Sequence, residues 1–150
     1  MASFIILVDG RDHATESGSL TLTDATLRAI GMDLRFRSNH VRVFTSPDAH
    51  ILPITGRGLI IGHLFSRTGQ LLDCLELAHP EQSLTQHLLE NFWGEYLAVD
   101  FFGGPADAFS VLRDPSGGVP CLYAFTDGAG FITSDVSIAA NLGRYNRRVD

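Results

Sequence analysis

Apolar runs of strand length recur along this 150-residue chain, and turn-forming residues end most of them. Residues 3–8 form one such run, which stops at Asp9-Gly10, and residues 58–65 (GLIIGHLF) form a longer one. A short apolar run bounded by a turn signal is typical of a buried strand. The chain is therefore expected to contain sheets whose strands are largely buried.

Alternating residues and turns predict further strands. Apolar residues alternate with arginine at 34–36 and at 41–43, on either side of a turn at 38–39, as they do in strands with two unlike faces. In the last third of the chain, turns at 103–105 and 127–128 predict two successive hairpins. Their strands are expected at residues 95–102, 108–112, 121–125 and 130–133.

Three short helices complete the expected elements. A polar, glycine-containing loop over residues 11–21 precedes the first of them. Cap residues and the spacing of apolar residues mark where each helix begins and ends. Helices are expected at residues 23–30 with Thr23 as N-cap, from Ser83 onward, and from Ser134 or Asp135 through Leu142 with Gly143 as the stop.

The order of these elements indicates an α+β fold in one domain over residues 1–150. Because several strands carry apolar residues on both faces, we expect two sheets packed face to face, with helices covering the outside. The composition, 45% hydrophobic and 19% charged, is that of an ordinary globular chain.

Charge and composition argue against several kinds of partner. Seventeen acidic residues against eleven basic ones give a net charge of -6, whereas a nucleic-acid surface needs clustered Lys and Arg. Arg144, Arg147 and Arg148 form the one basic cluster, which is interpreted as a solvated terminus. The apolar run at the start is too short for a signal peptide or a membrane span. We therefore expect a cytoplasmic protein that binds neither nucleic acid nor membrane.

Metal ligation is not expected either. Cys74 and Cys121 match no metal or redox spacing and are expected to be reduced thiols. The histidines show no H-x-x-x-H pair. They are scattered along the chain as His13, His40, His50, His63, His79 and His87.

Three motifs follow one another in residues 92–142. They are Gly94-Glu95-Tyr96, the pattern R-D-x-x-G-x-x-P over residues 113–120, and Ser134-Asp135 leading to AANL at 139–142. In this order and spacing they resemble the end of the glutaminase domain of asparagine synthetases and their relatives. The resemblance implies a class II glutamine-amidotransferase-like domain, with the four-layer αββα sandwich of Ntn hydrolases. It also implies an ATP-dependent synthetase domain beyond residue 150.

The central motif is expected to be structural. Arg113 and Asp114 end a strand where the chain must reverse, and Gly117 and Pro120 suit a sharp turn. Residues 116–118 (SGG) look like the start of the family's pyrophosphate loop. However, the Asp and Ser of that loop are absent here, and proline removes an N–H donor. This triplet is therefore predicted to be a turn.

The glutaminase machinery is expected to be degenerate. Ala2 stands where hydrolysing members of the family carry the nucleophilic cysteine. Ile61 replaces the amide side chain of the oxyanion hole, although Gly62 fits the motif. Glu81 is the one acid in residues 80–86, where the family places its substrate-holding acid. The resemblance thus predicts a domain without catalytic residues.

Two further residues leave alternatives open. His63, the last residue of the Ile61-Gly62-His63 motif, either contacts a ligand in a remnant pocket or is a partly exposed or structurally hydrogen-bonded residue. Ser3 would act as a nucleophile only if a second cleavage made it the first residue, which is not expected.

Relatives that lack the cysteine include β-lactam synthetases and lasso-peptide cyclases, which adenylate a carboxylate with ATP and capture it with an amine. Residues 62–67 with Gly69, and residues 92–99, look most like lasso-peptide cyclases. This resemblance implies a parent enzyme that uses ATP and Mg to close a macrolactam, on a precursor peptide or a small-molecule substrate, with no cofactor in this domain. The alternative is a stand-alone, non-catalytic module that binds a peptide or a protein.

Overall fold

The computed structural model describes residues 2–9, 17–101 and 108–144. The chain divides into two compact units, one of Met1–Ala49 with Pro120–Asp150 and one of His50–Val119. In chain order the elements are β1 (Phe4–Val8), α1 (Ser17–Ala29), β2 (Asp33–Arg37), β3 (Val41–Thr45), β4 (Ile51–Ile54), β5 (Gly58–Ser66), α2 (Leu84–Asn91), β6 (Phe92–Asp100), β7 (Ser110–Arg113), β8 (Leu122–Thr126), β9 (Ala129–Thr133) and α3 (Val136–Asn141).

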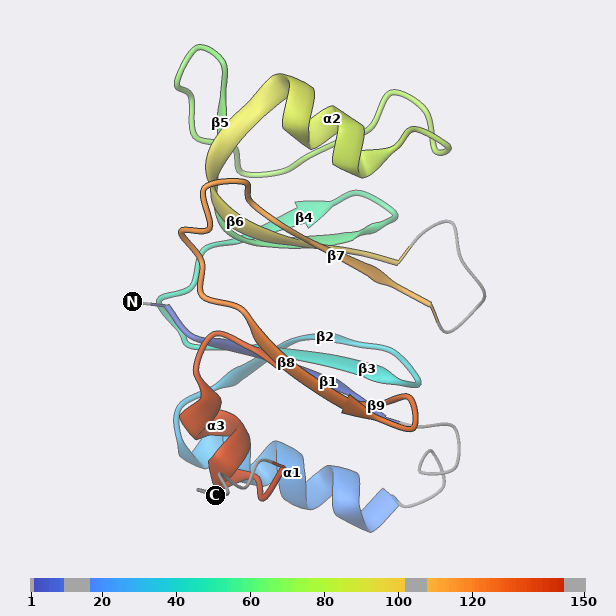
Figure 1. The fold of residues 1–150 in the computed structure, drawn as a ribbon, viewed down its shortest axis with the longest axis vertical. Helices are drawn as coiled ribbons and strands as arrows, with labels where there is room; N and C mark the ends of the chain where they lie inside the picture. The colour runs from blue at the N-terminus through green and yellow to red at the C-terminus, as the bar shows by residue number, and fades with distance from the viewer. Residues whose placement is uncertain (1, 10–16, 102–107, 145–150) are drawn as a thin grey trace. The chain divides into compact units, whose positions relative to one another are not determined.

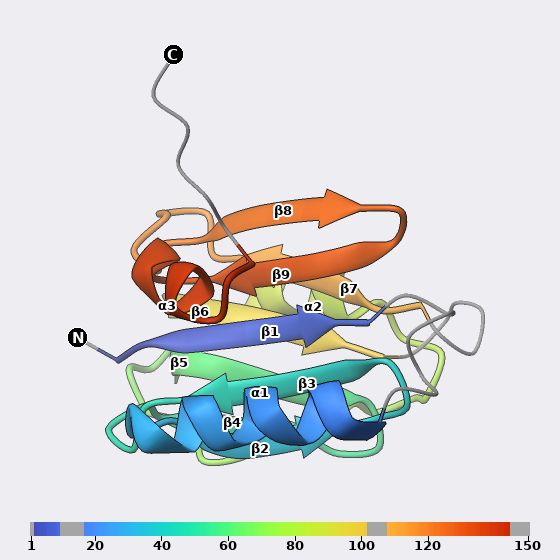
Figure 2. The ribbon, with the colours of Figure 1, turned by 90° about the horizontal axis from the view of Figure 1, so that it is seen from below.

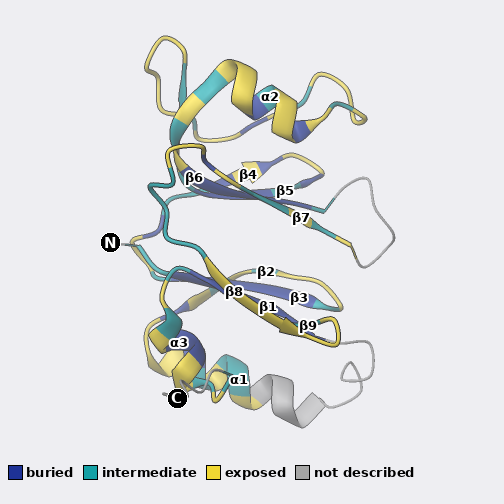
Figure 3. Cartoon of the chain, viewed as in Figure 1, coloured by how far each residue is buried: buried dark blue, intermediate teal, exposed yellow. Residues whose placement is uncertain are grey.

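The first unit is an antiparallel sheet with two helices on one face. Its strand order is β2-β3-β1-β9-β8, so the chain's first strand lies at the centre between β3 and β9 (Figures 1 and 2). Helices α1 and α3 pack on this sheet through a core of Ile5, Leu7, Leu27, Met32, Phe44, Phe131, Ile138 and Ala139. By contrast, the edge strand β8 is exposed along its whole length (Figure 3).

The second unit is an antiparallel sheet of order β4-β5-β6-β7, with α2 against one face (Figure 1). Ser83 caps α2, since its hydroxyl accepts a hydrogen bond from the backbone N–H of Gln86 at 3.2 Å. The core beneath the helix consists of Leu52, Ile54, Ile60, Leu64, Leu75, Leu84, Leu88, Tyr96 and Ala98. The expected α+β class with two antiparallel sheets is confirmed.

Most of the predicted elements are found where they were expected. The strands predicted at residues 3–8 and 58–65 are β1 and β5, and the hairpin around 127–128 is β8–β9. The helix predicted from Ser83 is α2. Asp135 caps α3, and its carboxylate accepts from the N–H of Ser137 at 2.9 Å. The turn predicted at 103–105 lies outside the described residues.

Two boundaries were wrong, and one strand was missing from the prediction. Helix α1 begins at Ser17, so Thr23 lies inside the helix and is not its cap. Serine and glycine are frequent in loops, which is why the sequence predicts a loop in this stretch. Strand β4 was not predicted; it contains Pro53, which is tolerated because β4 is an edge strand. Strand β6 starts at Phe92, which the helical spacing had assigned to the preceding helix.

Candidate functional site

A run of cross-strand pairs near one end of β5–β6 forms the floor of the candidate site. In the antiparallel register, His63 lies opposite Glu95 and Phe65 lies opposite Trp93. Directly opposed residues of an antiparallel pair project from the same face of the sheet. The four side chains are therefore neighbours on one face, although His63 and Glu95 are 32 residues apart in sequence and Phe65 and Trp93 are 28 apart.

These residues line a cavity of about 750 Å³ within the second unit. Helix α2 contributes a wall through Leu89, and the turn after β7 contributes Pro115 and Ser116. We call this cavity the aromatic pocket; it is lined by His63, Phe65, Leu89, Phe92, Trp93, Gly94, Glu95, Tyr96, Pro115 and Ser116.

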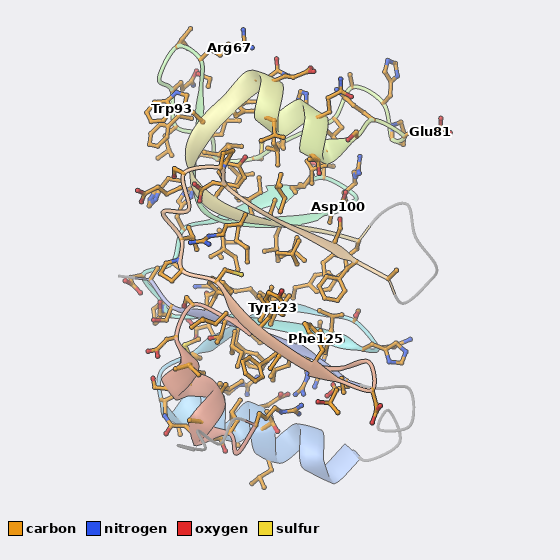
Figure 4. The ribbon with its side chains drawn as sticks, in the orientation of Figure 1. Arg67, Glu81, Trp93, Asp100, Tyr123 and Phe125 are labelled. Atoms are coloured by element: carbon orange, nitrogen blue, oxygen red, sulfur yellow. The ribbon has the colours of Figure 1, made fainter. Side chains whose placement is uncertain are left out.

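Trp93, which is labelled in Figure 4, is one of the aromatic residues that line the pocket. Its ring stacks on Phe65 with centroids 4.6 Å apart and planes 19° from parallel. Its indole N–H donates to the carbonyl oxygen of Ser66 at 3.0 Å, which fixes the orientation of the ring. The side chain is nevertheless 55% exposed. A large aromatic ring held in place but left accessible is typical of binding surfaces.

Gly94 allows the two strands to approach each other at this point. Its φ is +148°, and a Cβ built on it would lie 2.0 Å from the carbonyl oxygen of His63. Any other residue would force β5 and β6 apart between the His63–Glu95 and Phe65–Trp93 pairs. The geometry of the pocket floor therefore depends on this glycine.

Glu95 provides the negative charge of the pocket. The side chain is exposed and lies over the turn after β7, where a Cβ on Gly118 would come within 2.6 Å of its Cγ and Cδ atoms. Within the described part of the chain, no basic side chain forms an ion pair with this carboxylate. The carboxylate is thus available to a ligand.

His63 lies beside a second histidine. Its ring stacks on that of His50, with centroids 5.1 Å apart and planes 12° from parallel. The Nδ1 atom of His50 lies 2.8 Å from the carbonyl oxygen of Gly62. Since a carbonyl only accepts, this nitrogen carries the hydrogen and donates it. His50 is therefore oriented by the backbone of β5, and His63 is oriented by His50.

The turn after β7 is built around the Arg113-Asp114 pair. The guanidinium of Arg113 donates to the carbonyl oxygens of Gly117 at 2.7 Å and Val119 at 2.8 Å. Asp114 is 3% exposed. Its carboxylate accepts from the N–H of Tyr96 at 3.3 Å and from the hydroxyl of Ser116. Both side chains thus bind the backbone of the turn and of β6.

These contacts shift two pKa values in opposite directions. Burial alone would raise the pKa of Asp114. Hydrogen bonds from the Ser116 hydroxyl and from the backbone N–H groups of Tyr96, Gly118 and Val119 outweigh this and lower it. The pKa of the Tyr96 phenol is raised, first by its burial and then by the negative charge of Asp114. Asp114 is therefore ionised in the folded protein at neutral pH.

The residues of the predicted degenerate glutaminase site lie in both units. Ala2 precedes β1 in the first unit, whereas Ile61, Gly62 and His63 are consecutive in β5 of the second. The N–H of Gly62 donates to the carbonyl oxygen of His50 at 2.9 Å. Glu81 lies before α2, at the opposite end of the helix from Trp93 (Figure 4).

Of the central motif residues, Arg113, Asp114 and Gly117 lie in or beside the turn after β7. Pro120 begins the second segment of the first unit. Residues 116–118 belong to a turn in which the N–H of Gly118 donates to the Ser116 hydroxyl at 3.3 Å. Of the predicted site residues, His63 alone lines the aromatic pocket. The sequence did not predict Phe65, Trp93 or Glu95 as site residues, although all three lie in the segments 62–67 and 92–99 that carry the resemblance, and Trp93 is the chain's single tryptophan.

Comparison with protein-family models, with curated proteins and with solved structures finds no match to this chain. Among the described residues, no three His, Cys, Asp or Glu side chains are grouped so that they could hold a metal ion. None of the helices there combines the length and apolarity needed to cross a membrane.

Proposed function

We propose that this chain is a glutaminase-like domain that does not hydrolyse glutamine. The observation that carries the proposal is the hydrogen bond from the Gly62 N–H to the carbonyl oxygen of His50. An oxyanion hole needs donors aimed at the developing negative charge, and this donor is already engaged. Its neighbour Ile61 is buried and has no polar side-chain atom to offer.

The nucleophile is missing as well. Ala2 presents a methyl group where the reaction needs a thiolate. Ser3, the other candidate nucleophile, has its backbone N–H bonded to the Ser46 hydroxyl at 2.8 Å, and its carbonyl oxygen accepts from the Ser46 N–H. That pairing supports an interior position for Ser3 beside β1 and not a reactive terminus.

The proposal extends to the parent enzyme and to the packing of the sheets. The R-D-x-x-G-x-x-P motif supports membership of the asparagine synthetase family. The complete enzyme would then be an ATP- and Mg-dependent ligase, and the first candidate for that ligase is a lasso-peptide cyclase. Each sheet has a second apolar face opposite its helices, with Ile6, Val43 and Ile132 in register on one and Ile61 opposite Leu97 on the other. These faces support the four-layer αββα sandwich.

An ammonia-release assay tests the first part. The purified protein, with its N-terminus verified by mass spectrometry, should release no ammonia from glutamine above a heat-denatured blank. The double variant Ala2→Cys, Ile61→Asn should also remain inactive, because the Gly62 N–H is still bonded to His50. Turnover by the unaltered protein would disprove the proposal; turnover by the double variant would show that the oxyanion site had remained intact.

A search of the coding sequence past codon 150 tests the ligase. The proposal expects an S-G-G-x-D-S motif downstream, and a nearby gene for a short precursor peptide in the case of a lasso-peptide cyclase. A stop codon directly after Asp150 would contradict it.

A second candidate function is a non-catalytic binding module. The aromatic pocket favours this candidate, because it combines an accessible, fixed Trp93 ring with the Glu95 carboxylate. The two candidate functions make different predictions. A binding module should bind its ligand saturably without any ATP-consuming domain.

A further inference from the structure

We propose that the aromatic pocket binds a basic side chain of a peptide, with the aliphatic stem against the Phe65–Trp93 pair and the cationic end at Glu95. This inference rests on the binding role proposed second above. It does not depend on the loss of glutaminase activity or on the presence of a ligase domain.

The shape and lining of the pocket suit a side chain that is apolar along its length. Phe65 and Trp93 form a stacked pair, and Leu89 and Phe92 also line the pocket. A volume of about 750 Å³ falls in the usual range of ligand sites, about 300–1,000 Å³, and exceeds what one side chain fills. The pocket therefore has room for a basic residue together with its neighbours in a peptide.

The charge of the pocket selects a cation. Glu95 is the one acidic side chain among the lining residues, and the lining includes no arginine. Arg113, which belongs to the adjoining turn, already donates to two backbone carbonyls. The chain contains no lysine at all and has a net charge of -6. An anionic ligand would thus meet an uncompensated carboxylate, whereas a cation would neutralise it.

The two halves of the pocket are spaced for one residue type. Arg and Lys carry an apolar stem and a charged tip, and a cation over the face of a tryptophan gains further attraction. The register places Trp93 two residues before Glu95 on the same face of β6, so a stem lying along Trp93 brings its tip to the carboxylate. Neither a purely apolar side chain nor a small cation would use both features.

Fluorescence of the single tryptophan tests this directly. Three capped dipeptides, acetyl-Phe-Arg-amide, acetyl-Phe-citrulline-amide and acetyl-Phe-Glu-amide, are titrated into the whole protein. Citrulline has nearly the shape of arginine without its charge. We expect saturable binding of the arginine peptide, about tenfold weaker binding of the citrulline peptide, and no binding of the glutamate peptide.

Matched variants separate the pocket from the overall charge. Glu95→Gln should abolish the preference for arginine over citrulline. Glu76→Gln removes the same charge from an exposed position outside the pocket and should leave the preference intact. Equal effects of the two variants, equal affinity for arginine and citrulline, or the absence of saturation would each overturn the proposal. Circular dichroism checks that both variants fold.

Cross-linking gives an independent measurement. Carbodiimide joins carboxylates to amines, and the chain has no lysine to react with itself. Acetyl-Phe-Lys-amide should therefore be attached chiefly to Glu95, as located by peptide mass mapping. Uniform labelling of exposed acids such as Glu76 and Glu90 would contradict the site. Failure here would leave the ammonia-release result untouched, so the two proposals fail separately.

Discussion

At the scale of single residues, Asp114 organises the turn beside the aromatic pocket. A buried carboxylate is costly unless hydrogen bonds compensate for the lost water. Among the described residues none is in an ion pair with Asp114; backbone N–H groups and the Ser116 hydroxyl take that role instead. One side chain therefore holds the turn that carries Pro115 and Ser116 against Tyr96 in the middle of β6.

Asp114→Asn should destabilise the protein by about 1–3 kcal/mol at pH 7, because an amide is a weaker acceptor and brings two unneeded donors. The pKa of Asp114 is lowered from 3.8 in the folded state, so its stabilisation is complete above pH 3.8 and is lost as the pH falls through the lower folded value. Urea denaturation at pH 7, 5 and 3.5 should show the difference from the unaltered protein narrowing only at the lowest pH. Asp73→Asn, an exposed change in the same unit, is the control and should have little effect at any of these pH values. If Asp114→Asn lowered the free energy of unfolding by the same amount at all three pH values, this role of the Asp114 charge would be refuted.

At the scale of elements, the pairing of β5 with β6 creates the pocket. Nine consecutive pairs run from Gly58–Asp100 to Ser66–Phe92. The core under α2 fixes which face of each strand is buried, and a slip of one residue would send Trp93 and Glu95 to the other face. Gly94 is one of three glycines in this pairing, with Gly58 and Gly62, at which an added Cβ would lie 2.0–2.2 Å from a backbone carbonyl oxygen of the partner strand.

Gly94→Ala should cost about 3 kcal/mol, because its Cβ would clash with the carbonyl oxygen of His63 and the backbone would have to separate. Gly69→Ala is the matched control, since that glycine also has a positive φ, +85°, but no atom lies within 4 Å of the added carbon. Its cost should be about 1–2 kcal/mol. Chemical denaturation measures the free energy of unfolding of both variants. Equal losses would mean that the close approach of β5 and β6 at Gly94 adds nothing to the cost of backbone strain.

The same elements show what the sequence could and could not predict. β1, β5 and the β8–β9 hairpin were predictable because local apolar runs and turn residues mark them. β4 was not, because Pro53 is acceptable only on an edge strand, and edge position is a property of the assembled sheet. Likewise, nothing local indicates that Trp93 stacks on Phe65. That contact follows from the register of two strands separated by α2.

At the scale of the whole molecule, the first unit is discontinuous in sequence. Its central strand β1 pairs with β3 on one side and with β9 on the other, and the entire second unit lies between these partners in the chain. The sheet of the first unit is therefore complete only when residues 129–133 have joined it. Such long-range pairing favours slow folding over rapid local assembly.

The proposed sandwich also implies that the two units unfold together. Leu27 is fully buried in the first unit, so Leu27→Ala should cost about 2–5 kcal/mol. Trp93, the chain's one tryptophan, reports on the second unit alone. If the two units unfold together as proposed, Leu27→Ala should shift the Trp93 fluorescence transition in urea as far as the far-ultraviolet circular dichroism transition. Leu22→Ala, on the same helix but 71% exposed, should move neither. The contrary result is a fluorescence midpoint that stays in place while the midpoint of the circular dichroism transition moves to lower urea. It would mean that the units unfold independently and would argue against face-to-face packing of their sheets.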